Sequence, residues 1–213
     1  MLLPLLLLQA AAAHAVPDST KVGPLGPPPK AAAVTGAIGQ VTLSPVFDRP
    51  FACTEHPFGA LAYAGDALGT DCLVIGGIDG PSGFPKLYRT DGKSNADWYG
   101  WHADVLAPVN GIVLGTLQRP DTNTPGTMGT PPAGTIRFLS DDGVVVVYGH
   151  ATDFTVKPGD RVTAGQRIGR VGNNGVARAP HIHIGAYRAK DLAPLQIRWD
   201  LRAEARIFPA TGG

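Results

Sequence analysis

The chain has 213 residues, and its 18 Lys and Arg against 17 Asp and Glu give a formal net charge of +1. This balance argues against the basic surface that a nucleic-acid-binding protein needs. Glycine and proline number 28 and 20, a composition that suits a β protein rich in turns.

The first fifteen residues, MLLPLLLLQAAAAHA, resemble a signal peptide. The apolar stretch is too short to span a bilayer, and Ala13-His14-Ala15 gives a small-x-small cleavage pattern before Val16. No Lys or Arg precedes the apolar stretch, so an uncleaved anchor or a wrongly assigned start codon is the alternative. With cleavage after residue 15 we expect an exported, periplasmic or extracellular protein without stable membrane insertion. Its roughly 198 remaining residues suffice for one domain with a core.

Residues 16–39 include PLGPPPK and predict a flexible, proline-rich N-terminal arm. Residues 40–213 then form the domain. The chain has two cysteines, Cys53 and Cys72. In an exported protein they could form one disulfide, worth on the order of 3 kcal/mol in the chain-entropy model.

Short apolar runs, rich in β-branched residues and bounded by Gly, Pro, Asn and Asp, predict strands. These runs are residues 72–77, 104–117, 135–140, 144–150, 167–172 and 181–188. Asp142-Gly143 can form a hairpin turn, and residues 118–133 are too polar to be more than a hairpin loop. Because no long segment has a helical period, we predict an all-β, mostly antiparallel domain with long loops and few short helices.

Histidines mark two of these predicted strands. In the sequence PHIHIG, an extended chain places His181 and His183 on one face, roughly 6 to 7 Å apart, and the two isoleucines on the other. A third histidine, His150, ends the run VVVVYGH. Zinc takes N and O ligands and lowers the pKa of a bound water towards 7, while a nearby histidine can move a proton or stabilise an oxyanion. The residue types therefore favour a zinc hydrolase.

The stretch VVVVYGHATDFTVKPGDRVTAGQRIGRVGNNGVARAPHIHIG resembles the C-terminal signature of the lysostaphin-like (LytM-type) zinc endopeptidases. VLAPVNGIVLG resembles the strand–turn–strand that precedes it, so the likeness spans residues 104–186. The resemblance implies the all-β duplicated hybrid motif fold, one Zn²⁺ per chain and a peptide or peptidoglycan substrate.

The resemblance also implies roles for individual residues. His183 corresponds to a zinc ligand, and His150 and His181 correspond to the two catalytic histidines. One of these two is the general base and the other stabilises the oxyanion; which is which stays open. Arg178-Ala179 stands where the family usually has Ser/Thr-Gly, a departure that could alter the substrate groove.

The first ligand pair lacks the family's usual His-x-x-x-Asp motif. His102 and Asp104 are too close to the following strand for that role, and His102 is interpreted as a rim residue among Trp and Tyr side chains. Longer family members separate the pair, which favours His56 as the first ligand and Asp71 as the carboxylate. Asp66 is the alternative carboxylate.

The leading hypothesis is an exported zinc metalloendopeptidase that hydrolyses peptide bonds in peptidoglycan cross-links or stems. The alternative is a non-catalytic module of the same fold that binds cell wall or activates hydrolases, and a complete first ligand pair separates the two. A weaker option comes from VKPGDRVTAGQRIGRV, which resembles the hairpin of biotinyl and lipoyl carrier domains. Lys157 does not lie at such a turn, and the carrier reading leaves the histidines without a role.

Overall fold

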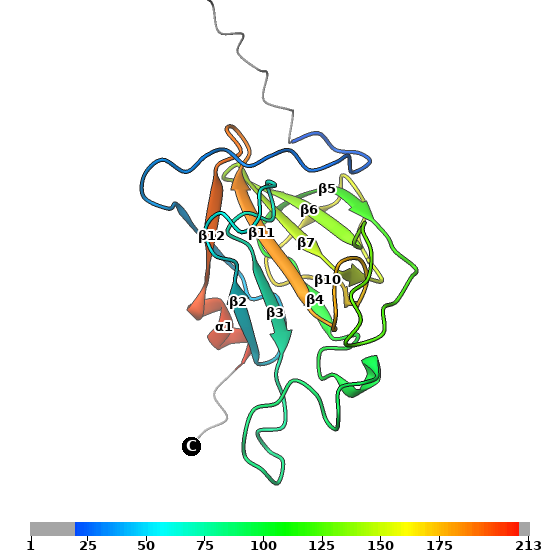
Figure 1. Cartoon of the computed structure of the whole chain (residues 1–213). Helices are drawn as coiled ribbons and strands as arrows, with labels where there is room; N and C mark the ends of the chain where they lie inside the picture. Colours follow the sequence, from blue (N-terminus) through cyan, green and yellow to red (C-terminus); the bar gives the residue numbers. More distant parts are fainter. Residues whose placement is uncertain (1–19, 209–213) are drawn as a thin grey trace, which may run out of the picture.

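A computed structural model describes residues 20–208 of the chain. The predicted signal peptide lies outside these residues. Within them are two β-sheets, one short α-helix and one turn of 3-10 helix (Figure 1). No helix in the described part is long and apolar enough to cross a bilayer. The predicted all-β class is confirmed.

The elements follow one another along the chain with loops of very different lengths. In order they are β1 (Gln40–Leu43), β2 (Phe51–Glu55), β3 (Thr70–Val74), η1 (Asn95–Asp97), β4 (Asp104–Leu106), β5 (Gly111–Leu117), β6 (Thr135–Ser140), β7 (Val144–Gly149), β8 (Ala151–Thr152), β9 (Arg161–Val162), β10 (Arg167–Val171), β11 (Ile182–Arg188), β12 (Pro194–Trp199) and α1 (Leu201–Ile207).

The large sheet has nine strands, with β11 near its centre. One edge of β11 pairs along its length with β7, and the other is shared between β3 and β12. These pairings are antiparallel, whereas β1 runs parallel to β12. The second sheet has the order β4-β10-β8. The connection between β3 and β4 extends below the sheets in Figure 1.

Most of the predicted strands are present at close to their predicted bounds. Residues 135–140 form β6, and β7 and β10 each end one residue earlier than predicted. The predicted run 104–117 is divided into β4 and β5 by a turn. Gly143 has φ 78°, which the predicted Asp-Gly hairpin turn requires. The structure adds the strands β1, β2, β8 and β12, which were not predicted, and α1 is one of the few short helices expected without a predicted position.

The core consists of apolar side chains from both sheets. Ile182 and Ile184 are fully buried, as the alternation of side chains along β11 predicts, and Tyr148 and Phe138 are fully buried beside them in the same cluster. The face of β11 that carries His183 is left for the candidate site. Burial of the isoleucines therefore fixes which way the histidine points.

The described part of the N-terminal arm runs along the domain surface (Figure 1). Backbone hydrogen bonds join Ala31 N to Ala62 O, Ala64 N to Pro29 O and Gly23 N to Leu114 O. The arm thus contacts the segment that leads into β3. The predicted domain boundaries stay predictions.

Cys53 and Cys72 form a disulfide. They lie directly opposite each other on the paired strands β2 and β3, so the disulfide that the sequence left open is confirmed. It joins the two strands that lead to the first predicted ligands.

Candidate metal centre and substrate groove

Three segments that are distant in sequence bring the predicted ligands together. His56 follows directly after β2, Asp71 lies on β3 and His183 lies on β11. Asp71 and His183 face each other across the β3–β11 pair. One ligand atom from each of the three residues lies within 4.8 Å of the others. The geometry is that of a group that can hold one metal ion.

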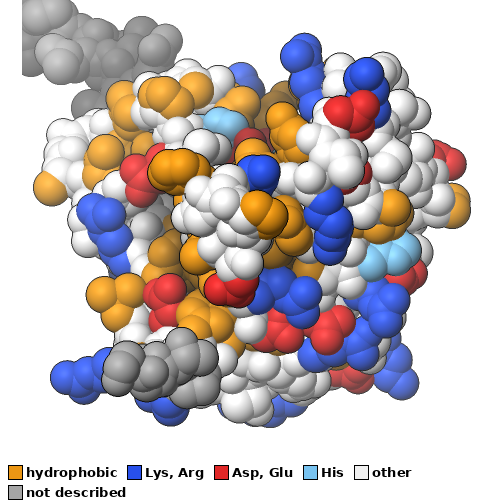
Figure 2. All heavy atoms as spheres, turned by 90° about the horizontal axis from the view of Figure 1, so that it is seen from below, with side chains coloured by type: hydrophobic (Ala, Val, Ile, Leu, Met, Phe, Trp, Pro, Cys, Tyr) orange, Lys and Arg blue, Asp and Glu red, His pale blue; other side chains and the backbone are white. Residues whose placement is uncertain are grey.

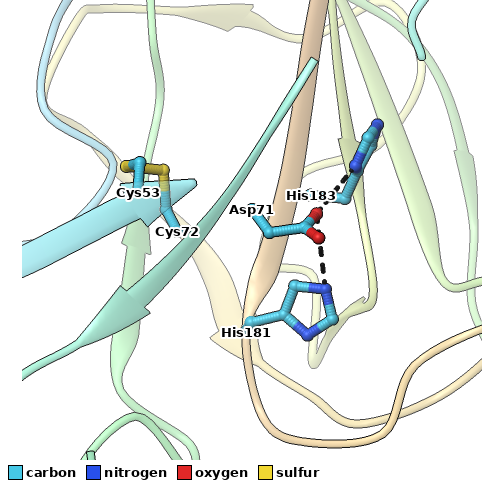
Figure 3. Close-up of a disulfide and its surroundings, with 5 residues drawn as sticks. All are labelled: Cys53, Asp71, Cys72, His181 and His183. Carbon is cyan, nitrogen blue, oxygen red and sulfur yellow. Dashed lines mark hydrogen bonds and ion pairs between the residues drawn. A yellow bond between two sulfur atoms is a disulfide. The ribbon is translucent and has the colours of Figure 1, made fainter. Parts of the chain in front are cut away.

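Asp71 is the centre of this group. Its Oδ1 lies 2.9 Å from His183 Nδ1 and 3.6 Å from His181 Nε2, and its Oδ2 lies 3.5 Å from His56 Nε2. Figure 3 shows the carboxylate between the imidazoles of His181 and His183, with the disulfide on the other side of β3. The alternation of side chains along β3 explains this placement, because Asp71 and Cys72 are neighbours.

Asp66 lies on the far side of the His183 ring. Its Oδ1 is 3.2 Å from His183 Nε2, the nitrogen that faces away from Asp71. Of the two carboxylates left open by the sequence, only Asp71 belongs to the group that combines His56 with His183.

His150 and His181 lie next to each other, with ring centroids 4.5 Å apart. Nδ1 of His150 is 2.8 Å from the carbonyl oxygen of Asn174, and Nδ1 of His181 is 2.8 Å from that of Ala179. Since a carbonyl only accepts hydrogen bonds, each Nδ1 carries the proton. When neutral, both rings therefore present the lone pair of Nε2.

His150 is held in an unusual backbone conformation. Its φ is 66°, in the left-handed region, and only 8% of the residue is exposed. The buried Asn174 side chain donates from Nδ2 to the carbonyls of His150 and Ala151, and its Oδ1 accepts from Gly134 N. Asn174 is thus bonded to His150 through both its side chain and its backbone. The sequence signal for it is the turn GNNG, whose second asparagine was not singled out.

The buried groups have shifted pKa values. Burial lowers the pKa of His150 to about 3, helped by the charge of His181. Burial also opposes the charged forms of Asp71 and His183, but their contacts outweigh it. The contacts with His181 and His183 hold the pKa of Asp71 well below its usual range, and those with Asp66 and Asp71 raise the pKa of His183 to about 9.

A groove of about 710 Å³ contains the five predicted site residues. Exposed apolar side chains border it, among them Tyr63, Met128 and Val176. Arg178, at the departure from the family pattern, also lines the groove. An apolar groove with a few converging polar groups is typical of a site that binds organic ligands.

The aromatic cluster predicted as a rim lies elsewhere. His102 stacks on Trp101 with ring centroids 4.1 Å apart, and neither residue lines the groove. Asp104 pairs with Arg167 instead of a histidine. On the face shown in Figure 2, acidic and basic side chains are mixed, as the net charge near zero leads one to expect.

The donor set fits zinc. Two imidazoles and one carboxylate are a ligand set that catalytic zinc sites use, with a further position left for solvent. The buried His56 Nε2 makes no hydrogen bond within the described residues, although it lies at ion-pair distance from Asp71. A cation bound between these groups would give this nitrogen a partner.

Comparison with known proteins agrees with this assignment. Residues 99–194 match the model of Peptidase family M23. The match contains His150, His181 and His183 and begins after His56 and Asp71, which the structure brings to the same site.

One curated relative is the glycyl-glycine endopeptidase ALE-1 of Staphylococcus capitis, 56% identical over 50 residues. That segment is 23% of this chain and spans only 14% of the relative. Among solved structures, the catalytic domain of lysostaphin from Staphylococcus simulans is similar with 19% identity and a TM-score of 0.37, over 68% of this chain and 77% of that one. A catalytic-domain mutant of EnpA from Enterococcus faecalis has 19% identity and a TM-score of 0.44, over 71% and 91% of the two chains.

Proposed function

We propose that this protein is a zinc metalloendopeptidase with His56, Asp71 and His183 as metal ligands. The premise is the match of residues 99–194 to the model of Peptidase family M23. The observation that carries the proposal is the convergence of these three side chains, whose ligand atoms lie within 4.8 Å of one another. Two of them come from outside the matched segment, so the ligand set rests on an observation independent of the family match.

Zinc bound there would supply a hydroxide-like nucleophile at neutral pH, because it lowers the pKa of coordinated water. The roles of the protein's own histidines follow from their tautomers. With Nδ1 bonded to a carbonyl, the Nε2 lone pairs of His150 and His181 can each accept a proton. The histidine that has gained a proton can then donate it to the leaving amine or stabilise the developing oxyanion. Burial lowers the pKa of His150 to about 3, so its ring is neutral at neutral pH, and either histidine can serve as the base.

The substrate we propose is peptide, in the cross-links or stems of peptidoglycan. The support is the name of the curated relative, a glycyl-glycine endopeptidase, together with 56% identity in the matching segment. Export to the periplasm or the cell exterior is part of the same proposal. The Cys53–Cys72 disulfide supports it, because disulfides persist in oxidising compartments.

The alternative, a non-catalytic wall-binding or hydrolase-activating module, requires an incomplete site. His56 and Asp71 supply the first ligand pair whose presence distinguishes the two functions. The enzyme is therefore the better supported of the two.

The test is metal analysis combined with a cleavage assay. Purified protein is expected to hold about one zinc per chain and to release fragments from a glycine-containing peptide and from purified peptidoglycan, detected by mass spectrometry. Protein without zinc and without cleavage would favour the module. Cleavage of the peptide alone would keep the peptidase and reject the cell-wall substrate.

A further inference from the structure

The turn of residues 63–69, between β2 and β3, lies against the candidate metal centre. Backbone hydrogen bonds from Asp66 N to Tyr63 O and from Gly69 N to Asp66 O close the turn. Its Ala64 is buried and packs in a second core cluster with Val145 and Tyr187. The turn is therefore anchored to the domain at the point where it meets the site.

Three glycines permit the turn to approach β11 closely. A Cβ at Gly185 would lie 1.7 Å from Gly65 O, and one at Gly69 would lie 2.9 Å from His183 Cε1. Gly65 itself has φ 95°, and a Cβ there would lie 2.7 Å from Val147 Cγ2. Since side chains at these positions would push the turn away from the strand, the sequence GDALG is adapted to contact the His183 ring.

The contact is made through the nitrogen of His183 that faces away from Asp71. His183 Nε2 lies 3.3 Å from Gly65 O and 3.2 Å from Asp66 Oδ1. A carbonyl and a carboxylate both accept hydrogen bonds, so together they keep a proton on Nε2. Nδ1, which lies 2.9 Å from Asp71, is then the nitrogen that would give up its proton to bind a metal beside that carboxylate.

The same turn also contacts the other histidine ligand. His56 N donates to Gly69 O at 2.8 Å. Two of the three proposed ligands are thus oriented by one short segment, one through its side chain and one through its backbone.

We propose that Asp66 is a positioning residue that orients His183 for zinc, and that it does not bind the metal itself. This inference rests on the zinc site of the proposed function. Partners of this kind on a ligating histidine fix its tautomer and orientation, and their loss usually weakens metal binding by about 10- to 100-fold. The carbonyl of Gly65 remains as a second acceptor, which limits the loss when Asp66 is removed.

The experiment measures zinc affinity by competition with a chelator for the full protein and for Asp66→Ala, Asp66→Asn and Asp71→Ala. We expect Asp66→Ala to bind zinc about 10-fold more weakly while still reaching one zinc per chain. Asp66→Asn should lose less, because its amide oxygen can accept from Nε2. Asp71→Ala should lose stoichiometric binding. The exposed Asp79, in another loop, supplies a matched control as Asp79→Asn, which should leave the affinity unchanged.

Cobalt(II) substitution gives a readout that a ligand and a positioning residue affect differently. The visible absorption bands of the cobalt protein should be the same in the wild type and in Asp66→Asn, because the ligand set is the same. Altered bands with a loss of affinity equal to that of Asp71→Ala would make Asp66 a ligand and overturn the proposal. So would an Asp66→Ala protein with wild-type affinity. The wild type's own zinc content tests the proposed function separately, since an Asp66 effect can be observed only where the site binds metal.

Discussion

Asp71 and His183 face each other on adjacent antiparallel strands, and Asp71 Oδ1 lies 2.9 Å from His183 Nδ1. Because a shift of one residue in the pairing would turn either side chain to the opposite face of the sheet, the register of β3 on β11 determines whether the site exists. The buried isoleucines on either side of His183 hold that register from the core side.

Replacing His183 by alanine is expected to remove most of the zinc from the purified protein. The change deletes one of the three proposed ligands and removes the contact between His183 Nδ1 and Asp71 Oδ1. Metal analysis after dialysis measures the effect. His102→Ala is the control, because His102 stacks on Trp101 and lies outside the groove. Equal zinc in the His183 variant and the control would contradict the ligand assignment.

Replacing His150 or His181 by alanine should leave zinc bound and reduce kcat by about 100- to 10,000-fold, the usual contribution of general acid–base catalysis. Their Nδ1 atoms bond to carbonyl oxygens, and neither residue belongs to the metal-holding group. Metal content and single-turnover cleavage should be measured on the same preparations. Zinc loss as large as that of His183→Ala would show that the division of roles is wrong.

Replacing Asn174 by alanine is expected to lower both kcat and stability. It removes the acceptor of Gly134 N and the donor to the His150 and Ala151 carbonyls, and each buried group left unpaired costs about 1 to 3 kcal/mol. The released backbone should allow His150 to leave its left-handed conformation. Asn110→Ala is a matched control, because Asn110 bonds a backbone N–H far from the groove. That variant should keep its kcat, and a kcat equally low in both would reject a positioning role for Asn174.

The lowered pKa of His150 predicts how stability depends on pH. Between about pH 3 and 6.5 the unfolded chain binds a proton at this residue and the folded protein does not. Stability from the neutral, buried His150 is therefore complete above about pH 6.5 and falls as the pH is lowered through this window. Urea unfolding of the wild type and His150→Gln in the presence of EDTA should give a steeper rise of unfolding free energy with pH in the wild type. Parallel slopes would contradict the shift.

Replacing both cysteines by serine should lower the free energy of unfolding by about 3 kcal/mol. Without the closed loop, the unfolded chain has a higher conformational entropy and is therefore more stable relative to the folded protein. Urea unfolding with and without dithiothreitol measures this. Reductant should destabilise the wild type and have no effect on the double variant. A wild type that does not respond to reductant would mean that the disulfide adds nothing to stability.

Much of the sheet could be predicted because most of its strands can be recognised from the local sequence alone. From β4 to β11 the apolar runs are bounded by turn residues such as Gly143 and Gly159, both with positive φ. The strands that were missed, among them β1 and β2, are short and carry few buried side chains. The conformation of β1 also depends on a partner far away in the chain, β12, which no local pattern reveals.

The candidate site, like the sheet, could be predicted only in part. His150, His181 and His183 are part of a spaced signature, whereas His56 and Asp71 were chosen over Asp66 and Asp104 without any local rule that could decide between them. What decides is a strand pairing between residues 112 positions apart, Asp71 and His183. The roles assigned to the five residues stay predictions until they are measured.

Two different strands share one side of β11. β3 pairs with residues 182–184 and β12 with residues 186 and 187, so Gly185 lies at the boundary between them. Trimming β12 would remove Leu195 and Ile197 from the core cluster that also contains Ile182 and Ile184, although the pairing of β3 with β11 includes no residue of β12. A module fused after α1 would join the domain through β12, and not through β3 or the first half of β11, which carry Asp71 and His183.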